Sequence, residues 1–198
     1  AIVLVYTLYG GMWSVALTDF VQMIVITVGL LLIAWYAADL AGGAGKVIDY
    51  AAREGKFNFF PTGGAKEWTF FFAAAITMML GSIPQQDVFQ RVMSSNNATT
   101  ARRGPVAGGL LYIGFAFVPM FVVIAALIVM PGTSGLLSDD PQKVLPTLVM
   151  EHMPVALQVA FFGALLSAIM STASATMLAP STTFVENILR NLRPGMRD

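Results

Sequence analysis

Two neighbouring hydroxyl groups, on Ser171 and Thr172, are the side chains whose spacing most readily suggests chemistry. The backbone carbonyl of Ala168 lies one helical turn before them, so all three oxygens would share one face of a helix. Oxygen ligands suit a hard cation such as Na⁺, by analogy with calcium and magnesium sites. A complete site needs oxygens from another helix, so this spacing favours a cation site only together with a second element.

The same segment also has a purely structural explanation. Small residues recur at every fourth position between residues 161 and 184, which is typical of helices that pack closely in a membrane. One stripe contains Gly163, Ser167, Ser171 and Ala175, and the other contains Ala164, Ala168, Thr172 and Thr176. Spacing alone favours helix packing over cation binding.

A second polar group, formed by Ser82, Gln85 and Gln86, lies beside an expected break in a helix. Gly81 is conformationally free, and Pro84 removes a backbone donor and clashes with the preceding turn. Irregular backbone at membrane depth is tolerated where it lines a cavity, and broken helices mark substrate sites in secondary transporters. The break by itself fits a plain proline kink equally well.

Charged residues near the apolar segments also have simple explanations. Asp19 precedes an apolar run and is followed by Gln22, which suggests a capping box at a helix start. Asp87 and Arg91 are four residues apart, with the acid first, and could pair along one helix. His152 has no second histidine to form a metal site with, and we expect it at the membrane interface.

The elements that hold these groups are expected to be membrane-spanning helices. The 198 residues are 57% hydrophobic and 11% charged, whereas an ordinary soluble domain has about 25% charged residues. A helix needs about 20 apolar residues to cross the hydrocarbon core. With His152 taken as neutral, the charge-free runs cover residues 1–18, 20–38, 68–86, 104–138 and 152–185. We expect helices near 20–39, 68–92 with a break near 81–86, 105–130 and 154–186, with 1–9 ending an earlier helix. The loops between them predict short helices over 47–55 and near 141–151.

Composition and motifs exclude several other classes of protein. Acidic and basic residues both number 11, so no basic field attracts nucleic acid. The absence of cysteine removes disulfides and thiolate chemistry, and no hydrolase or nucleotide-binding motif occurs. We therefore expect no covalent chemistry and no enzyme.

Arginines predict the orientation in the membrane. The segment between the expected helices 68–92 and 105–130 and the tail after residue 186 carry an excess of arginine, which marks cytoplasmic segments. The residues are Arg91, Arg102 and Arg103 in the first and Arg190, Arg193 and Arg197 in the second. We predict a cytoplasmic C-terminal end in a bacterial inner (plasma) membrane.

Three blocks, over residues 6–22, 83–103 and 161–188, resemble the sodium/solute symporter family in matching order. The block over 83–103 is most similar to the branch of high-affinity choline transporters. The resemblance implies an all-α, polytopic, five-plus-five inverted-repeat fold with one broken helix and alternating access. Residues 1–198 would be a partial transporter domain, a fragment covering about core helices five to eight. It further implies a carrier that needs no cofactor and uses Na⁺ as the coupling ion.

The resemblance also implies site residues. The family's sodium site has an A-x-x-S-[ST] pattern, which Ala168, Ser171 and Thr172 match. A second sodium site, or an exit path, maps to Asp19 and Ser174.

Substrate contacts in the family map to Ser82, Gln85 and Gln86. Choline carriers resemble IPWQ here, whereas this chain has Gln85 in place of the aromatic ring that suits a quaternary ammonium. We expect a small organic solute that is polar, zwitterionic or choline-like. The partners are then Na⁺, this solute and the lipid bilayer. The alternatives are a transporter-like membrane sensor fused to a signalling kinase, and a degenerate scaffold that binds without transporting.

Overall fold

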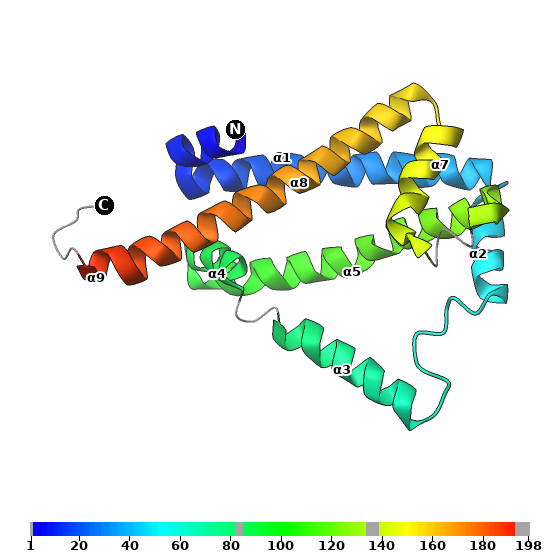
Figure 1. Ribbon diagram of the computed structural model, residues 1–198, viewed down its shortest axis with the longest axis horizontal. Helices are drawn as coiled ribbons and strands as arrows, with labels where there is room; N and C mark the ends of the chain where they lie inside the picture. Colours follow the sequence, from blue (N-terminus) through cyan, green and yellow to red (C-terminus); the bar gives the residue numbers. More distant parts are fainter. Residues whose placement is uncertain (1, 82–84, 134–138, 193–198) are drawn as a thin grey trace.

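The computed structural model describes residues 2–81, 85–133 and 139–192, and these residues are helical apart from the connecting segments (Figure 1). Three helices long and apolar enough to cross a membrane occur within the described residues, over Tyr9–Leu40, Ala98–Val129 and Val155–Leu192. With the absence of strands from the described residues, this confirms the expected all-α class. The apolar faces of these helices are those of an integral membrane protein.

The first long helix, α1 (Ile2–Leu40), contains an abrupt change of backbone at Gly11, where φ is 53° and ψ is −145°. Glycine adopts this conformation without steric cost, so Gly11 bends the chain between two helical stretches. The second stretch includes Asp19, which therefore lies inside the helix. The capping box predicted for Asp19 and Gln22 is wrong, because the helix has already begun before Asp19 and the polar pair does not mark its start.

Short helices connect the long ones at one end of the molecule (Figure 1). They are α2 (Ala44–Arg53), the 3₁₀ turns η1 (Pro131–Thr133) and η2 (Pro141–Lys143), and α7 (Val144–His152). The predicted helices over 47–55 and near 141–151 correspond to α2 and to η2 with α7. A cluster of buried apolar side chains lies at this end, and includes Ile33, Val122, Leu148 and Phe161.

The segment over 68–92, predicted to be a helix with a break near 81–86, contains two helices among the described residues. They are α3 (Ala65–Gly81) and α4 (Gln86–Met93), and residues 82–84 between them lie outside the described part. α3 has 17 residues and none of its side chains is buried. It stands apart from the other helices, whereas α4 lies beside α8 and α5 (Figure 1).

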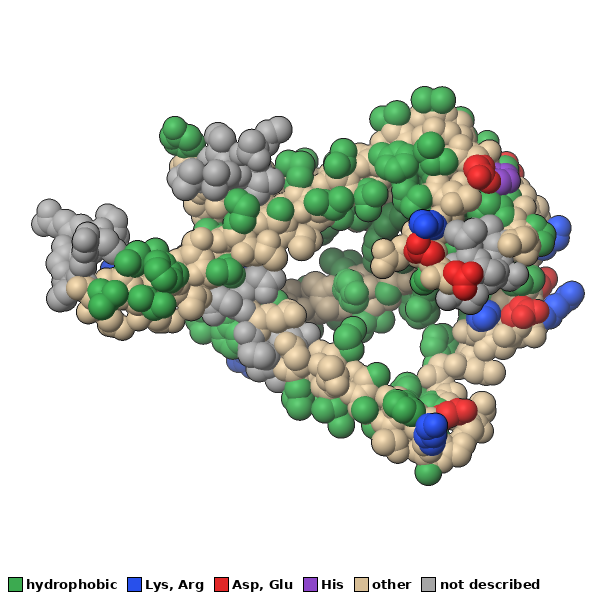
Figure 2. All heavy atoms as spheres, in the orientation of Figure 1, with side chains coloured by type: hydrophobic (Ala, Val, Ile, Leu, Met, Phe, Trp, Pro, Cys, Tyr) green, Lys and Arg blue, Asp and Glu red, His purple; other side chains and the backbone are tan. Residues whose placement is uncertain are grey.

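The remaining helices complete the arrangement around α1. These are α5 (Ala98–Val129), α8 (Val155–Phe184), the π-helical η3 (Val185–Leu189) and α9 (Arg190–Leu192). Asn97 begins α5 by accepting a hydrogen bond from the Thr100 backbone N–H at 2.8 Å, as an N-cap residue does. Figure 2 shows charged side chains gathered at the end with α2 and α7, and apolar side chains along the long helices.

Candidate functional site

The close approach of α1 to α8 positions the candidate site. Gly29 is buried, and a Cβ added to it would lie 3.4 Å from the Ala164 Cβ and 3.5 Å from the Ala160 carbonyl oxygen. Small residues at such a contact let two helix backbones come near each other. The stripe of small residues predicted to pack α8 therefore does so at Ala164.

The carboxylate of Asp19 joins three helices. The Ser171 hydroxyl of α8 donates to its Oδ1 at 2.7 Å, and the Arg91 Nη2 of α4 donates to its Oδ2 at 2.7 Å. The Asp19 side chain is 19% exposed and that of Arg91 is 41% exposed. A largely enclosed carboxylate needs such charged and polar partners, because removing it from water is costly. Asp19 is therefore the point where α1, α4 and α8 are held together.

The oxygens predicted for sodium lie on one turn of α8. The Thr172 hydroxyl donates to the Ala168 carbonyl at 3.0 Å, while the Ser171 hydroxyl points to α1. A carbonyl and a hydroxyl oxygen each keep a lone pair after one such contact. The Asp19 carboxylate brings an oxygen from another helix, α1, within 2.7 Å of the Ser171 hydroxyl. The set contains carboxylate, hydroxyl and carbonyl oxygens, which are the donors a hard cation prefers.

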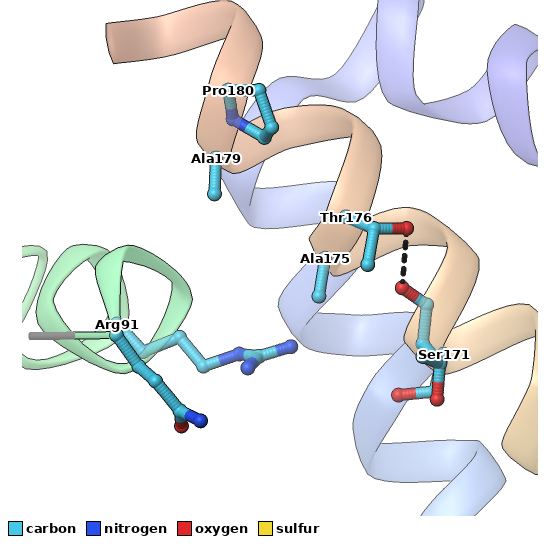
Figure 3. A pocket seen from close by; sticks show the side chains of 8 residues that line it. Arg91, Ser171, Ala175, Thr176, Ala179 and Pro180 are labelled. Atoms are coloured by element: carbon cyan, nitrogen blue, oxygen red, sulfur yellow. Dashed lines mark hydrogen bonds between the residues drawn. The ribbon is translucent and has the colours of Figure 1, made fainter. Parts of the chain in front are cut away.

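A cavity of about 530 Å³ opens beside this turn (Figure 3). Gln85 and Arg91 line it from the side of α4, and Ser171 and Thr172 line it from α8. The other lining residues are Ala175, Thr176, Ala179 and Pro180. Figure 3 shows the Arg91 side chain extended from α4 toward α1 and α8. The cavity thus places one residue of the predicted substrate group beside two residues of the predicted sodium group.

The other predicted residues occupy different positions. Ser174 is fully buried on α8, and its hydroxyl donates to the Met170 carbonyl at 2.9 Å. Gln85 precedes α4 in an extended conformation, and Gln86 is the first residue of that helix. Ser82 lies outside the described residues.

Two polar residues of the site were not recognised from the sequence. Arg91 binds Asp19, which is 72 positions away and on another helix. Its pairing with Asp87 along α4 stays a prediction. Gln22 lies one turn after Asp19 on α1, and its side-chain oxygen is buried without a hydrogen-bond partner among the described residues. Gln22 could have been recognised because it is a polar residue within the charge-free, apolar run 20–38.

Comparison with known proteins identifies the relatives of the chain. The family model described as "Sodium:solute symporter family" matches residues 1–198. The human high affinity choline transporter 1 is 32% identical over 202 residues, which cover 92% of this chain and 33% of that protein. The zebrafish (Danio rerio) sodium/glucose cotransporter 4 is 27% identical over 234 residues, covering 98% of this chain and 34% of that protein.

The pig (Sus scrofa) sodium/myo-inositol cotransporter 2 is 24% identical over 227 residues, covering 98% of this chain and 33% of that protein. The chain spans about a third of the length of the curated relatives it matches. No solved structure matches it. The resemblance stated from the three sequence blocks is confirmed by the family match and by the similarity to choline transporters.

Proposed function

Because the chain belongs to the sodium:solute symporter family, we propose that it is part of a carrier that imports a small organic solute together with Na⁺. Transport by this family requires binding and conformational change rather than covalent chemistry, so the carrier is not an enzyme. Residues 1–198 form a partial transporter domain of the five-plus-five inverted-repeat fold, and the solute moves by alternating access.

The observation that carries the proposal is the cavity beside α8. It is lined at once by Gln85, next to the helix break, and by Ser171 and Thr172. A coupled carrier needs the ion and the solute to influence each other's affinity, and such coupling is reciprocal. Because residues proposed for Na⁺ and for the solute line one cavity, binding of one ligand can directly affect binding of the other.

In the proposed mechanism Na⁺ binds the Ala168 carbonyl and the hydroxyls of Ser171 and Thr172 from the outer side. The bound ion stabilises the outward-open state and helps to order the broken helix. The Asp19 carboxylate and Ser174 form a second sodium site or the exit path toward the cytoplasm. Ser174 lies close to Ser171 in the sequence. The support for Asp19 is its 2.7 Å contact with Ser171.

The solute binds near the helix break, at Ser82, Gln85 and Gln86. Relatives are named for choline, glucose and myo-inositol, which are all small and rich in polar or cationic groups. The amide of Gln85 offers a hydrogen-bond donor and acceptor rather than an aromatic face. A polar or zwitterionic solute therefore fits this side chain at least as well as a quaternary ammonium ion.

The orientation follows from the excess of arginine described above. We propose that the loop before α5 and the end after α8 face the cytoplasm. The bacterial inner membrane stays a prediction from the sequence, since the relatives named above are animal proteins.

Uptake by the complete protein in proteoliposomes tests the function. Labelled choline, glucose, myo-inositol and a panel of zwitterionic amino acids are offered with an inward Na⁺ gradient or with K⁺ in its place. We expect uptake of at least one solute that requires Na⁺. Undiminished uptake in K⁺ contradicts sodium coupling. Na⁺ binding without uptake of any solute favours the sensor or scaffold alternative.

A further inference from the structure

The ion pair between Arg91 and Asp19 differs from the other described ion pairs in what it connects. Lys143 pairs with Asp140 three residues away, and Arg190 pairs with Glu186 four residues away, so each stabilises only its own segment. The Arg91–Asp19 pair joins α4 to α1 across 72 positions, and Ser171 of α8 binds the same carboxylate. Its formation or loss changes how three helices are held together.

Both oxygens of the Asp19 carboxylate are engaged in this state. Ser171 donates to Oδ1 and Arg91 donates to Oδ2, each at 2.7 Å. A hydroxyl can turn its hydrogen away and offer a lone pair to a cation, because its hydrogen rotates freely. A guanidinium cannot, because it has five donors and no acceptor. Na⁺ can therefore share Asp19 with Ser171, but it meets a fixed positive charge at Arg91.

We propose that Arg91 is an exchangeable counter-ion of Asp19, which Na⁺ replaces when it binds the carboxylate. The proposal rests on the proposed sodium coupling. Arg91 and Na⁺ compete for one carboxylate, so Na⁺ binding at Asp19 requires Arg91 to leave it. The buried, unpartnered oxygen of Gln22, one turn from Asp19, is a further ligand available to the incoming ion.

The cavity gives Arg91 a place to go. Arg91 lines that space, its side chain is 41% exposed, and the cavity volume of about 530 Å³ is ample for a guanidinium group. An arginine that leaves Asp19 can thus remain solvated beside α8.

The exchange couples the ion to the solute pocket. Arg91 lies on α4, and Gln85 immediately precedes that helix and lines the same cavity. When Arg91 is released, α4 loses its ionic attachment to α1, and the position of Gln85 relative to α8 is free to change. Arg91 is accordingly a positioning residue that transmits sodium binding from Asp19 to the broken helix.

The test is a Na⁺ titration of the complete protein in detergent, at constant ionic strength with K⁺, followed by thermal stabilisation and by ²²Na⁺ binding. Replacing Arg91 with glutamine removes the competitor, so we expect the half-saturating Na⁺ concentration to fall by about three- to ten-fold. Arg91→Lys retains a competing charge and should stay near the wild-type value. Arg102→Gln is the matched control, since it removes an exposed arginine at the start of α5, and it should leave the value unchanged.

The outcomes separate the inference from the proposed function. If the wild-type protein shows no response to Na⁺, the proposed function fails. If the wild type responds but Arg91→Gln needs as much Na⁺ or more, Arg91 is only a structural tie and the exchange is wrong.

A second measurement covers the case in which Arg91→Gln does not fold. Spin labels at Met93 and Phe184, which are both exposed, report the distance between α4 and the end of α8 in an otherwise unchanged protein. We expect Na⁺ to shift this distance, and Asp19→Asn to make it insensitive to Na⁺. A distance that does not respond to Na⁺ overturns the proposal.

Discussion

Enlarging Gly29 is expected to separate α1 from α8 and to weaken the site that these helices form. A Cβ at Gly29 would lie 3.4 Å from the Ala164 Cβ, which is an ordinary contact distance, so Gly29→Ala fits without rearrangement. The further carbons of Gly29→Leu must enter space already occupied by Ala164 and the Ala160 carbonyl. Overpacking of this kind costs about 1–3 kcal/mol.

The two Gly29 variants differ in size at one position, so each is the control for the other. We expect Gly29→Ala to change the free energy of unfolding by no more than about 1 kcal/mol, the difference in helix propensity. Gly29→Leu should lower it by about 1–3 kcal/mol and raise the Na⁺ concentration for half-maximal stabilisation, because Ser171 moves away from Asp19. The assay is unfolding of the complete protein in detergent, with and without Na⁺. If Gly29→Ala and Gly29→Leu have the same free energy of unfolding, α1 and α8 do not approach each other closely at Gly29.

Three further predictions concern the solute, the orientation and the stability of α5. Gln85→Trp places an aromatic face at the cavity and should raise affinity for choline by about two- to thirty-fold, measured by competition in uptake; no gain would show that the solute does not contact this position. In a cysteine-free background, Thr62→Cys should react with an impermeant maleimide from outside and Asn96→Cys only after permeabilisation; the reverse pattern would invert the orientation. Asn97→Ala should destabilise the protein by about 1 kcal/mol in thermal or chemical unfolding while Asn97→Asp does not, since Asn97 caps α5 through the Thr100 N–H.

Local patterns predicted the elements well where composition alone decides them. Long charge-free runs predicted long apolar helices, because the cost of a charge in hydrocarbon leaves few other arrangements. Gly81 and Pro84 predict an interruption near 81–86, because their backbone chemistry acts locally, and α3 and α4 lie on either side of it. The position of helix starts was predicted less well, and Asp19 shows why. An acid inside a membrane helix resembles a cap until its distant partner is known.

The contacts between helices could not be read from the sequence. Arg91 binds Asp19 from another element, 72 positions away, and no spacing along the chain indicates this contact. Periodicity reports only neighbours within one helix, whereas the pairing of α1, α4 and α8 depends on the tertiary arrangement. Ser171 was selected from its spacing with Thr172 and from a family pattern, and neither predicted its contact with Asp19 of α1.

The central claim is that Na⁺ binds at Ser171 and Thr172 on α8. The Na⁺ affinity of a variant that lacks both hydroxyls tests this claim most directly. Ser171→Ala with Thr172→Ala removes two proposed ligands from the complete protein. The matched control, Ser181→Ala with Thr183→Ala, removes two hydroxyls of α8 that donate to their own helix at the Met177 and Ala179 carbonyls.

If each lost ligand contributes about 1 kcal/mol, the half-saturating Na⁺ concentration in a ²²Na⁺ binding assay should rise by about ten-fold or more in the first variant. The control variant should keep the wild-type value. If both variants and the wild type have the same half-saturating Na⁺ concentration, sodium binding at this turn of α8 is contradicted.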